Sequence, residues 1–414
     1  MKKFTMVELF SGIGAQAKAF SRACKSRENI SFSTVSTCEW DIHAIIAYYL
    51  IHKERKQLLK WDKKKCLDFL FPLSLSNDGK KKTSFSYISK LDLELLRTLC
   101  TAIKETNNMI DVTKVKGEDL PSNLDVLTYS FPCQDLSNVG AFHGYNKGID
   151  RDAHSRSGLL WEVERILKER VESNFDLPRF LILENVTSLE AKRHLNNFQD
   201  WQNQLKKLGY MNIIFRLDAM NLGIPQHRKR LIMLSVLTKN NKKIERKIDL
   251  YFKSKKNNIN NRRLQLASLR SFLRLDYKIK KYFNEALSAQ PNNTQSRLKI
   301  WEQNLIILDE NNDCVEYTAT ITTKQDRHPN SGNLYFDYEG NYKSKYRFLT
   351  PRECFLLMGF DEKDYEKIAK KTYLSNKRSY FFSRDKLYKL AGNSIVVNVL
   401  EQIFNAIIDL DDII

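Results

Sequence analysis

Short apolar runs recur over the first 240 residues and alternate with stretches of helical periodicity. Residues 158–171, for example, repeat apolar side chains at the spacing of one helix face. Five runs have the length of buried strands: 6–10, 32–38, 124–129, 180–183 and 231–236. This alternation predicts βαβ units, and hence an open, mostly parallel α/β sheet with helices on both faces.

The pattern breaks after residue 239. Residues 239–263 are rich in Lys and Asn, which indicates a domain boundary or a basic surface loop. The chain then stays irregular to about 345, and a helical pattern returns at 394–408, with Asn393 or Ser394 as its N-cap. We therefore predict a large domain over 1–240, a smaller, mostly irregular or β domain over 241–384, and a C-terminal helix over 385–414 that completes the large domain.

The charge is basic and unevenly placed. The 414 residues carry a net charge of +19, from 68 Lys and Arg against 49 Asp and Glu. Residues 241–384 hold 29 of the basic and 17 of the acidic residues, a net +12 in about a third of the chain. A basic excess in one segment is typical of a nucleic-acid partner, although the codon usage of a low-GC genome also inflates Lys counts. Residues 52–110 are a second basic stretch, expected to be helical in part and without an assigned role.

The composition excludes several classes of protein. With 42% apolar and 28% charged residues the chain is typical of a soluble globular protein. No run approaches 18 apolar residues and the N-terminus does not resemble a signal peptide, so we expect a cytoplasmic protein with no membrane partner. Seven cysteines without a Cys-x-x-Cys pair or a Cys/His cluster predict reduced thiols and no metal site.

A glycine-rich turn follows the first predicted strand. Gly12, Gly14 and Ala17 match the G-x-G-x-x-G/A pattern, and Glu39-Trp40 ends the next predicted strand. The glycines would let a ligand approach the backbone, the acid would accept bonds from ribose hydroxyls, and the indole would stack on an adenine. The pattern fits S-adenosylmethionine, a nicotinamide, a flavin or a plain structural turn.

Cys133 differs from the other cysteines in its position. It follows a predicted strand, Pro132 fixes the backbone before it, and a glycine-containing loop that could close over a substrate comes after it. A free thiol is only about 3% ionised at pH 7, so forming the thiolate costs roughly 2 kcal/mol. A thiolate that adds to an electron-poor ring splits a difficult substitution into easier steps. The alternative is a small buried hydrophobe, which is what most single cysteines are.

Two further groups of residues complete a candidate site. Glu184 ends the apolar run 180–183, where burial would keep a proton available to a ring nitrogen; an N-cap or an ion pair at a strand end is the alternative. Gln226, Arg228 and Arg230 alternate along the approach to the last predicted strand, so we expect them to share a face. Two guanidinium groups on one face suit a phosphate and a base carbonyl, although basic strand ends are common.

In this order the motifs resemble the C5 cytosine-specific DNA methyltransferase family, in its bacterial restriction-modification form. The resemblance covers nearly the whole chain except about 240–340. The elements that carry it are Phe10-Ser11-Gly12-Ile13-Gly14, Glu39-Trp40, Asp111-Val112, Phe131-Pro132-Cys133-Gln134, Arg156-Ser157-Gly158-Leu159, Glu184-Asn185-Val186, Gln226-His227-Arg228-Lys229-Arg230, Arg347 to Glu353, and Gly392-Asn393-Ser394.

The resemblance implies a Rossmann-like, S-adenosylmethionine-dependent methyltransferase domain with a smaller target-recognition domain. Cys133 is then the nucleophile on C6 of a flipped-out cytosine, and Glu184 contacts ring N3. Arg230 contacts the cytosine O2, and Arg228 lies nearer the phosphate backbone. The implied S-adenosylmethionine pocket consists of Phe10, Gly12, Gly14, Glu39, Trp40, Asp111, Val112, Pro132, Leu159, Asn393 and Ser394.

The resemblance also implies contacts to double-stranded DNA. The loop 135–157 and the recognition domain would extract the target base, which costs a few kcal/mol of stacking and pairing. The expected DNA-binding residues are Gln134, Ser137, Arg156, Thr320, Thr322, Lys324, Gln325 and Arg327. A separate restriction endonuclease is a possible partner, and a monomer is the expected state.

The chain departs from the family pattern in two places, and three alternatives stay open. Thr128-Tyr129-Ser130 replaces the small lead into the Pro-Cys turn, and the 52–110 insertion is long. One alternative is the tRNA-methylating branch of the same fold, which carries a Cys-Phe-Thr element. The nearest string in this chain is Cys354-Phe355-Leu356. The others are a dinucleotide-dependent oxidoreductase, which leaves Cys133 unexplained, and a catalytically silent nucleic-acid-binding protein.

Overall fold

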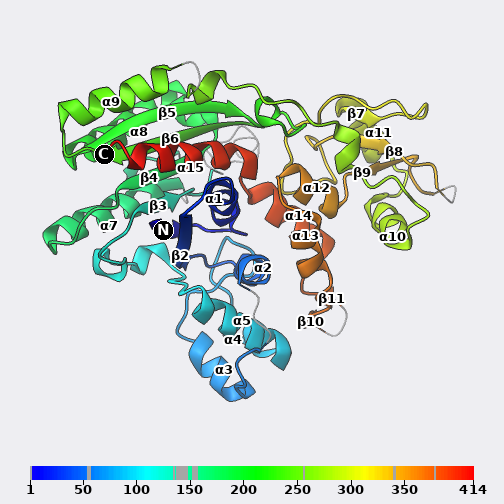
Figure 1. Cartoon of the computed structure of the whole chain (residues 1–414). Helices are drawn as coiled ribbons and strands as arrows, with labels where there is room; N and C mark the ends of the chain where they lie inside the picture. Colours follow the sequence, from blue (N-terminus) through cyan, green and yellow to red (C-terminus); the bar gives the residue numbers. More distant parts are fainter. Residues whose placement is uncertain are drawn as a thin grey trace. The chain divides into compact units, whose positions relative to one another are not determined.

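The computed structural model describes residues 2–53, 57–133, 136, 148–151, 157–254, 257–338, 342–376 and 379–414 (Figure 1). The chain forms two compact units. The first unit consists of Met1–Leu217, Lys229–Arg262 and Leu400–Ile414, and the second of Asp218–Arg228 and Arg263–Val399. The chain therefore enters the second unit twice and returns to the first.

A six-stranded sheet in the order β2-β1-β3-β4-β6-β5 is the frame of the first unit. Strands β1 to β4 run parallel, and β6 runs antiparallel to β4. The five predicted strands are confirmed, and β5 is an additional one. The strands are β1 (Lys2–Leu9), β2 (Ile30–Cys38), β3 (Val126–Tyr129), β4 (Phe180–Asn185), β5 (Tyr210–Asp218) and β6 (Lys229–Leu237).

Helices cover both faces of the sheet, as the alternation predicts. Val7 and Leu9 of β1 belong to one core cluster with apolar residues of α7 (Leu160–Glu172) and α8 (Lys192–Lys207). Phe4 points to the opposite face, because side chains alternate along a strand, and contacts Phe20 of α1 (Ala15–Lys25). Phe20 also stacks on Phe404 of α15 (Val397–Asp411) with ring centres 4.4 Å apart, so α1 and α15 lie side by side (Figure 1).

The stretch predicted to be helical in part contains three helices, and a fourth precedes them. Each begins at an Asp or Ser whose side chain accepts a bond from a backbone N–H of the first turn, which satisfies donors left free at a helix start. The helices are α2 (Ile42–His52), α3 (Lys63–Leu70), α4 (Phe85–Ser89) and α5 (Leu93–Glu105).

The prediction of a boundary or loop over 239–263 is wrong for its first half. Residues Lys242–Lys253 form helix α9, which belongs to the first unit. Asn241 caps it through bonds to the N–H groups of Lys243 and Ile244. Only Ile248 of this helix is buried. Its Lys and Arg residues, together with the Asn-rich residues that follow it, gave this stretch the composition of a loop.

The second unit joins helices to two small sheets. One sheet holds β7 (Ile306–Leu308), β8 (Asn333–Tyr335) and β9 (Tyr346–Phe348), and the other pairs β10 (Leu374–Asn376) with β11 (Ser379–Tyr380). Its helices are α10 (Lys280–Ala289), α11 (Gln295–Gln303), α12 (Pro351–Leu357), α13 (Glu362–Ala369) and α14 (Arg384–Asn393). The predicted α/β class with a smaller, largely irregular part is confirmed.

The last helical pattern is divided differently from the prediction. Asn393 is the final residue of α14 and Ser394 is its C-cap, so neither caps α15, which begins at Val397. Taken together, Arg384–Asp411 is long and apolar enough to cross a membrane by length and composition alone. However, 72% of its most apolar window is buried, as in a core helix of a soluble protein.

A fully buried ion pair lies in the second unit. The Arg347 guanidinium donates to both carboxylate oxygens of Glu353, with Nη1–Oε2 2.8 Å and Nη2–Oε1 2.9 Å. Both side chains are 0% exposed. The same carboxylate accepts from the N–H of Arg274 and from the N–H of Thr350, which is the N-cap of α12. Glu353 therefore connects three segments of this unit.

Candidate active site

The predicted site residues of the first unit gather at one edge of the sheet. Leu9 pairs with Cys38 and with Tyr129, and Tyr129 pairs with Leu183, so four parallel strands end together. The chain order reverses between β1 and β3, and ligands of open α/β sheets bind at such a switch point. The segments that follow these strands carry the glycine turn, Glu39, Cys133 and Glu184.

The glycine turn has the backbone that the sequence predicts, but its two glycines serve different purposes. Gly12 and Gly14 adopt left-handed conformations with φ of 53° and 79°. A Cβ on Gly12 would meet no atom within 4 Å, so ligand atoms have room to approach this backbone. A Cβ on Gly14 would lie 2.3 Å from His52 Nε2 and 2.7 Å from the Tyr48 ring. Gly14 is thus required by protein packing, and its part in ligand access stays a prediction.

Glu39 is bonded to this turn. Its Oε2 accepts from the N–H of Gly12 at 3.0 Å, and its Oε1 accepts from the N–H groups of Trp40 and Asp41 at 2.9 and 2.8 Å. The carboxylate therefore joins the end of β2 to the turn after β1. Trp40 is half-buried beside it. This is the arrangement expected if the turn and the acid bind one ligand.

Asn108 holds the next predicted segment at the end of β2. Its Oδ1 accepts from the Glu39 N–H at 3.0 Å, and its Nδ2 donates to the Glu39 carbonyl at 3.1 Å. Asp111 and Val112 follow: Asp111 caps the short helix η1 (Val112–Lys114), and Val112 is buried. Asp111 and Val112 were predictable from the sequence, whereas Asn108 was not, because its role depends on pairing between distant segments.

Ser157 connects the predicted Leu159 to the Pro-Cys turn. Its hydroxyl donates to the Pro132 carbonyl at 2.6 Å. Leu159 lies two residues later, at the end of helix η4 (Ser157–Leu159) and at the N-cap of α7. This contact of Ser157 was not predictable from the sequence. Asn393 and Ser394 belong to the second unit, and their part in a cofactor pocket stays a prediction.

These residues fit S-adenosylmethionine. The open backbone at Gly12 gives room for a ligand, Glu39 supplies a carboxylate fixed by three amides, and Trp40 supplies a ring. Acid, turn and ring come from the ends of adjacent strands. Among the described residues, no group of three or more His, Cys, Asp or Glu side chains is arranged to hold a metal ion.

Cys133 is held just beyond the end of β3. Asn185, the last residue of β4, donates from Nδ2 to the Phe131 carbonyl at 3.1 Å, and the Cys133 carbonyl accepts from the Leu136 N–H at 3.0 Å. The thiol is half-buried, whereas five of the other six cysteines are buried. The exception is Cys314, which belongs to the second unit. A half-buried thiol at this edge suits a nucleophile better than a core position does.

Glu184 and Arg230 meet at the same edge. Because β6 is antiparallel to β4, the start of β6 lies beside the end of β4. The Arg230 Nε is 3.2 Å from Glu184 Oε1, and the two side chains are 16% and 10% exposed. The ion pair at a strand end, which the sequence left open as an alternative, is therefore present. It also holds the two predicted catalytic side chains together.

The prediction that Gln226, Arg228 and Arg230 share a strand face is wrong. Strand β6 begins at Lys229, so Gln226 and Arg228 precede it and belong to the second unit. The Arg228 guanidinium donates to the carbonyls of Ile321, Gly392 and Ser394. Arg228 is only 4% exposed. Its guanidinium therefore links backbone segments of the second unit, in place of the predicted phosphate contact.

The predicted DNA-binding residues divide into three groups. Gln134, Ser137 and Arg156 lie outside the described residues. Lys324 and Arg327 are exposed, as a DNA contact requires. The remaining residues bond within the second unit: Thr320 Oγ1 donates to the His227 carbonyl and Thr322 Oγ1 to the Lys324 carbonyl.

Gln325 corrects one of these predictions. It is 1% exposed, its Nε2 donates to the Thr322 carbonyl and its Oε1 accepts from the Ser331 N–H. Asn330 Nδ2 donates to the Gln325 backbone carbonyl. The side chain that was expected to read base edges therefore stabilises the loop that carries Lys324 and Arg327.

A buried acid beneath the glycine turn was not predicted. Glu8 of β1 is 0% exposed, and it accepts from Tyr48 Oη at 2.6 Å and from Thr34 Oγ1 at 3.3 Å. Burial raises the pKa of Glu8 to about 7, although the bonds from Tyr48 and Thr34 act to lower it. Tyr48 also packs where a Cβ on Gly14 would lie, so Glu8 supports the turn through Tyr48.

Glu8→Gln is expected to remove part of the pH dependence of stability. Because the Glu8 pKa is higher in the folded protein than its ordinary 4.5, the folded state binds more protons, and stability falls as pH rises from 4.5 to about 7. At about 1.36 kcal/mol per pKa unit, this amounts to about 3 kcal/mol. Urea unfolding at pH 5 and pH 8 should show a pH difference smaller by that amount in the variant. The exposed Glu28→Gln is the control, and equal pH dependence in Glu8→Gln and wild type would contradict the prediction.

Known proteins match this chain over most of its length. The model of a family described as C-5 cytosine-specific DNA methylase matches residues 71–409. The chain is 31% identical to the orphan methyltransferase M.SssI of Spiroplasma monobiae, over 98% of this chain and 97% of that protein. It is also 31% identical to the type II methyltransferase M2.ScrFI of Lactococcus lactis subsp. cremoris, over 96% of this chain and 97% of that protein.

Solved structures resemble the fold. Dnmt2 methyltransferase of S. pombe superposes with a TM-score of 0.58 at 17% identity, over 99% of both chains. The Entamoeba histolytica methyltransferase EhMeth gives a TM-score of 0.58 at 16% identity, again over 99% of both chains. At this identity the likeness supports the shared α/β architecture alone.

Proposed function

Since the chain belongs to the C-5 cytosine-specific DNA methylase family, and is therefore an S-adenosylmethionine-dependent enzyme that methylates DNA cytosine, we propose that it acts through a covalent Cys133–C6 adduct on a flipped-out cytosine of a specific duplex sequence. The observation that carries the proposal is the shared sheet edge. Cys133, Glu184 and Arg230 lie there together with the Gly12 turn and Glu39.

In the proposed reaction Cys133 opens the sequence of steps. Its thiolate adds to C6 of cytosine, which moves electron density to C5 and makes that carbon nucleophilic. The bond from C5 to the methyl carbon then forms, as the bond between that carbon and the donor sulfur breaks. Loss of the C5 proton to a base and breaking of the Cys133–C6 bond restore the aromatic ring and the free thiol.

Glu184 and Arg230 stabilise the ring during these steps. We assign the Glu184 carboxyl, in its protonated form, to ring N3, where negative charge develops when C6 is attacked. We assign the Arg230 guanidinium to the adjacent O2. Their 3.2 Å contact brings both groups to neighbouring atoms of one ring edge. Donors fixed in advance where charge develops are the strongest contribution that most enzymes make to a rate.

S-Adenosylmethionine supplies the electrophilic methyl group and leaves as S-adenosylhomocysteine. We assign its binding to the Gly12 turn, Glu39 and Trp40, with Asp111 and Val112 beside them. The carboxylate would accept from the ribose hydroxyls, and the Trp40 ring would pack against the adenine. The Gly12 turn follows β1, and Glu39 and Trp40 follow β2. Strand β1 lies beside β3, which precedes Cys133.

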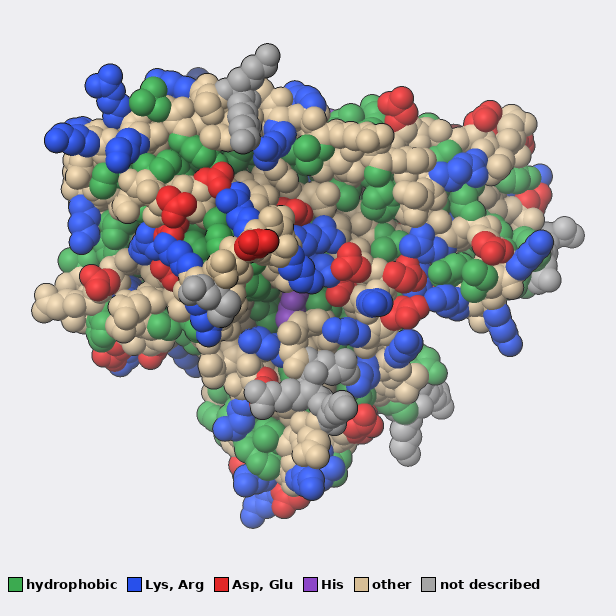
Figure 2. All heavy atoms as spheres, in the orientation of Figure 1, with side chains coloured by type: hydrophobic (Ala, Val, Ile, Leu, Met, Phe, Trp, Pro, Cys, Tyr) green, Lys and Arg blue, Asp and Glu red, His purple; other side chains and the backbone are tan. Residues whose placement is uncertain are grey.

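We propose duplex DNA as the substrate and the second unit as its recognition domain. The second unit carries 24 Lys and Arg against 17 Asp and Glu, a net charge of +7. Lys and Arg side chains are spread among Asp and Glu over the face in Figure 2. Distributed positive charge favours contact with several phosphates. We further propose a cytoplasmic monomer, whose cognate endonuclease, if one is encoded, acts separately.

The proposal is tested by transfer of a labelled methyl group from S-adenosylmethionine to unmethylated duplex DNA, with tRNA assayed in parallel. Label on cytosine C5 at a reproducible duplex sequence would support it. Label on tRNA alone would assign the chain to the RNA-methylating branch of the fold. Absence of label on both would favour a catalytically silent DNA-binding protein.

Glu184→Gln is expected to slow methyl transfer by roughly 10²-fold or more while changing cofactor affinity little, because acid–base assistance typically contributes that much. Single-turnover rates and the Kd for S-adenosylmethionine separate the two effects. Glu190→Gln is the matched control, since Glu190 is also ion-paired, to Arg216, but lies outside the site. Equal losses of rate and of cofactor affinity would indicate that Glu184 has a structural role instead.

A further inference from the structure

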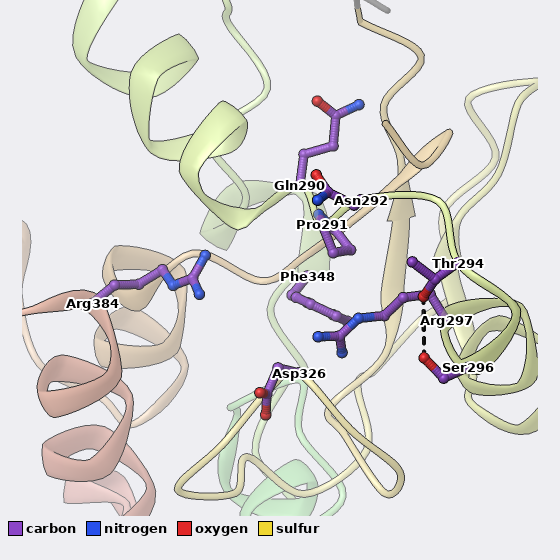
Figure 3. Close-up of a pocket in the computed structure, with 9 residues that line it drawn as sticks. All are labelled: Gln290, Pro291, Asn292, Thr294, Ser296, Arg297, Asp326, Phe348 and Arg384. Carbon is purple, nitrogen blue, oxygen red and sulfur yellow. Dashed lines mark hydrogen bonds between the residues drawn. The ribbon is translucent and has the colours of Figure 1, made fainter. Parts of the chain in front are cut away.

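A polar pocket of about 360 Å³ lies within the second unit (Figure 3). Separate segments contribute to it: Arg297 comes from α11, Phe348 from β9, and Arg384 from the start of α14. Asp326 comes from the loop that also carries Lys324 and Arg327. Arg297 and Arg384 reach inward from opposite sides, with Asp326 below them in the view. Nothing in the proposed methyl-transfer chemistry uses this pocket.

Two opposite charges in the pocket do not neutralise each other. Across the described parts of the chain, the Arg297 guanidinium and the Asp326 carboxylate make no ion pair, with each other or with another side chain. The guanidinium lies 5.7 Å from the centre of the Phe348 ring, which supports its position. The pocket therefore presents the N–H donors of the Arg297 guanidinium and, separately, the two acceptor oxygens of the Asp326 carboxylate.

Arg384 differs from Arg297 in this respect. Its guanidinium donates to the Ser288 carbonyl, and its Nε lies 3.6 Å from Asp385. Arg384 therefore adds positive charge at the rim, whereas Arg297 and Asp326 retain their hydrogen-bonding capacity for a ligand. A ligand that satisfies both must carry adjacent acceptors and a donor.

The major-groove edge of a C·G base pair has this pattern. Guanine presents O6 and N7, which an arginine contacts with two bonds, and cytosine presents its N4 amino group, which a carboxylate accepts. An A·T pair lacks the two adjacent acceptors on one base. A phosphate would use the arginine but would be repelled by Asp326. The charges of Arg297 and Asp326 thus favour a base pair over the DNA backbone.

We propose that Arg297 and Asp326 read one C·G base pair, in addition to the pair of the target cytosine. The Arg297 guanidinium donates to guanine O6 and N7, and the Asp326 carboxylate accepts from cytosine N4. This inference rests on the proposed function, because it presupposes that the second unit contacts duplex DNA. It adds a specific position to the recognition sequence and names the residues that select it.

The test compares sequence preference at each position of the wild-type site. Methylation rates are measured on duplexes in which each base pair is replaced in turn. Arg297→Ala and Asp326→Asn should both relax the preference at the same C·G position, by roughly 5- to 150-fold, and leave the other positions unchanged. Lys299→Ala, from the same helix, and Glu316→Gln, an exposed acid of the same unit, should leave every preference unchanged.

Two results would overturn the inference. Uniform weakening at all sequences by Arg297→Ala would assign that residue to a phosphate, and relaxation at different positions by the two variants would show that they do not read one pair. Affinity selection from a randomised duplex library is run in parallel, because it needs no methyl transfer. If the wild type methylates no DNA yet selects a C·G position that both variants lose, the catalytic proposal fails and this inference stands.

Discussion

Cys133→Ala is expected to reduce methyl transfer to background, by roughly 10³-fold or more, while DNA affinity changes little. Without the thiol, C5 of cytosine is never made nucleophilic, and no other group at the sheet edge replaces a covalent nucleophile. The variant should fold normally, because the side chain is small and half-buried. Methyl incorporation and DNA binding, measured on the same preparation, separate chemistry from recognition.

A chemical trap sharpens this test. The substrate is a DNA duplex whose target cytosine carries fluorine at C5, incubated with S-adenosylmethionine. After methyl transfer, C5 has no proton to lose, so the Cys133–C6 bond persists. The protein then migrates with the DNA on a denaturing gel. The wild type and Cys314→Ala, which removes the other half-buried thiol, should both form the adduct. An adduct in Cys133→Ala, or methylation near the wild-type rate, would rule out the proposed nucleophile.

Arg347→Met is expected to destabilise the second unit by about 3–5 kcal/mol, because it leaves the Glu353 carboxylate buried without its counter-charge. Burial alone would raise the pKa of Glu353, but the Arg347 guanidinium and two backbone N–H groups hold it below its ordinary value. The stabilisation therefore belongs to the ionised acid. It is present above the pKa of the unfolded chain and is lost as pH falls through the lower pKa of the folded state.

Trp301 provides the measurement. Of the five tryptophans it alone belongs to the second unit, so urea unfolding followed by ¹⁹F NMR of fluorotryptophan-labelled protein reports this unit separately. The double variant Arg347→Met/Glu353→Leu should recover much of the loss, since no charge then stays buried. Lys345→Met, in an exposed pair with Asp337, should cost less than about 1 kcal/mol. A loss of that size in Arg347→Met itself would contradict the prediction.

The strands with continuous apolar runs were predictable, because a strand covered on both faces must be apolar throughout. Strand β5 mixes polar with apolar residues, Arg216 among them, and was missed. Strand β2 has a similar mixture and was predicted, so partial burial lowers the signal of a strand without removing it. Helix α9 was missed for a related reason, because Ile248 is its one buried side chain. In α9 the solvent-facing positions outnumber the buried one, and the Lys and Arg residues among them gave this stretch the composition of a loop.

The candidate site was predictable where chain order alone determines position. Cys133 and Glu184 follow parallel strands, and parallel strands end at one edge. Arg228 was placed wrongly because its direction depends on where β6 begins and on carbonyl groups far along the chain. Asn108 and Ser157 were missed because a single polar side chain gives no local signal of the distant carbonyl or amide that it bonds.

The division of the first unit along the chain has a consequence for protein synthesis. Residues up to Arg262 leave the ribosome well before Leu400–Ile414, the segment that completes this unit. Until then Phe20 lacks Phe404, its stacking partner in α15, and part of the sheet's helical cover is missing. Residues Arg263–Val399, most of the second unit, are translated in this interval. The first unit therefore stays incomplete, with part of its apolar surface exposed, until Leu400–Ile414 has been synthesised. During this period a chaperone would have an apolar surface to bind.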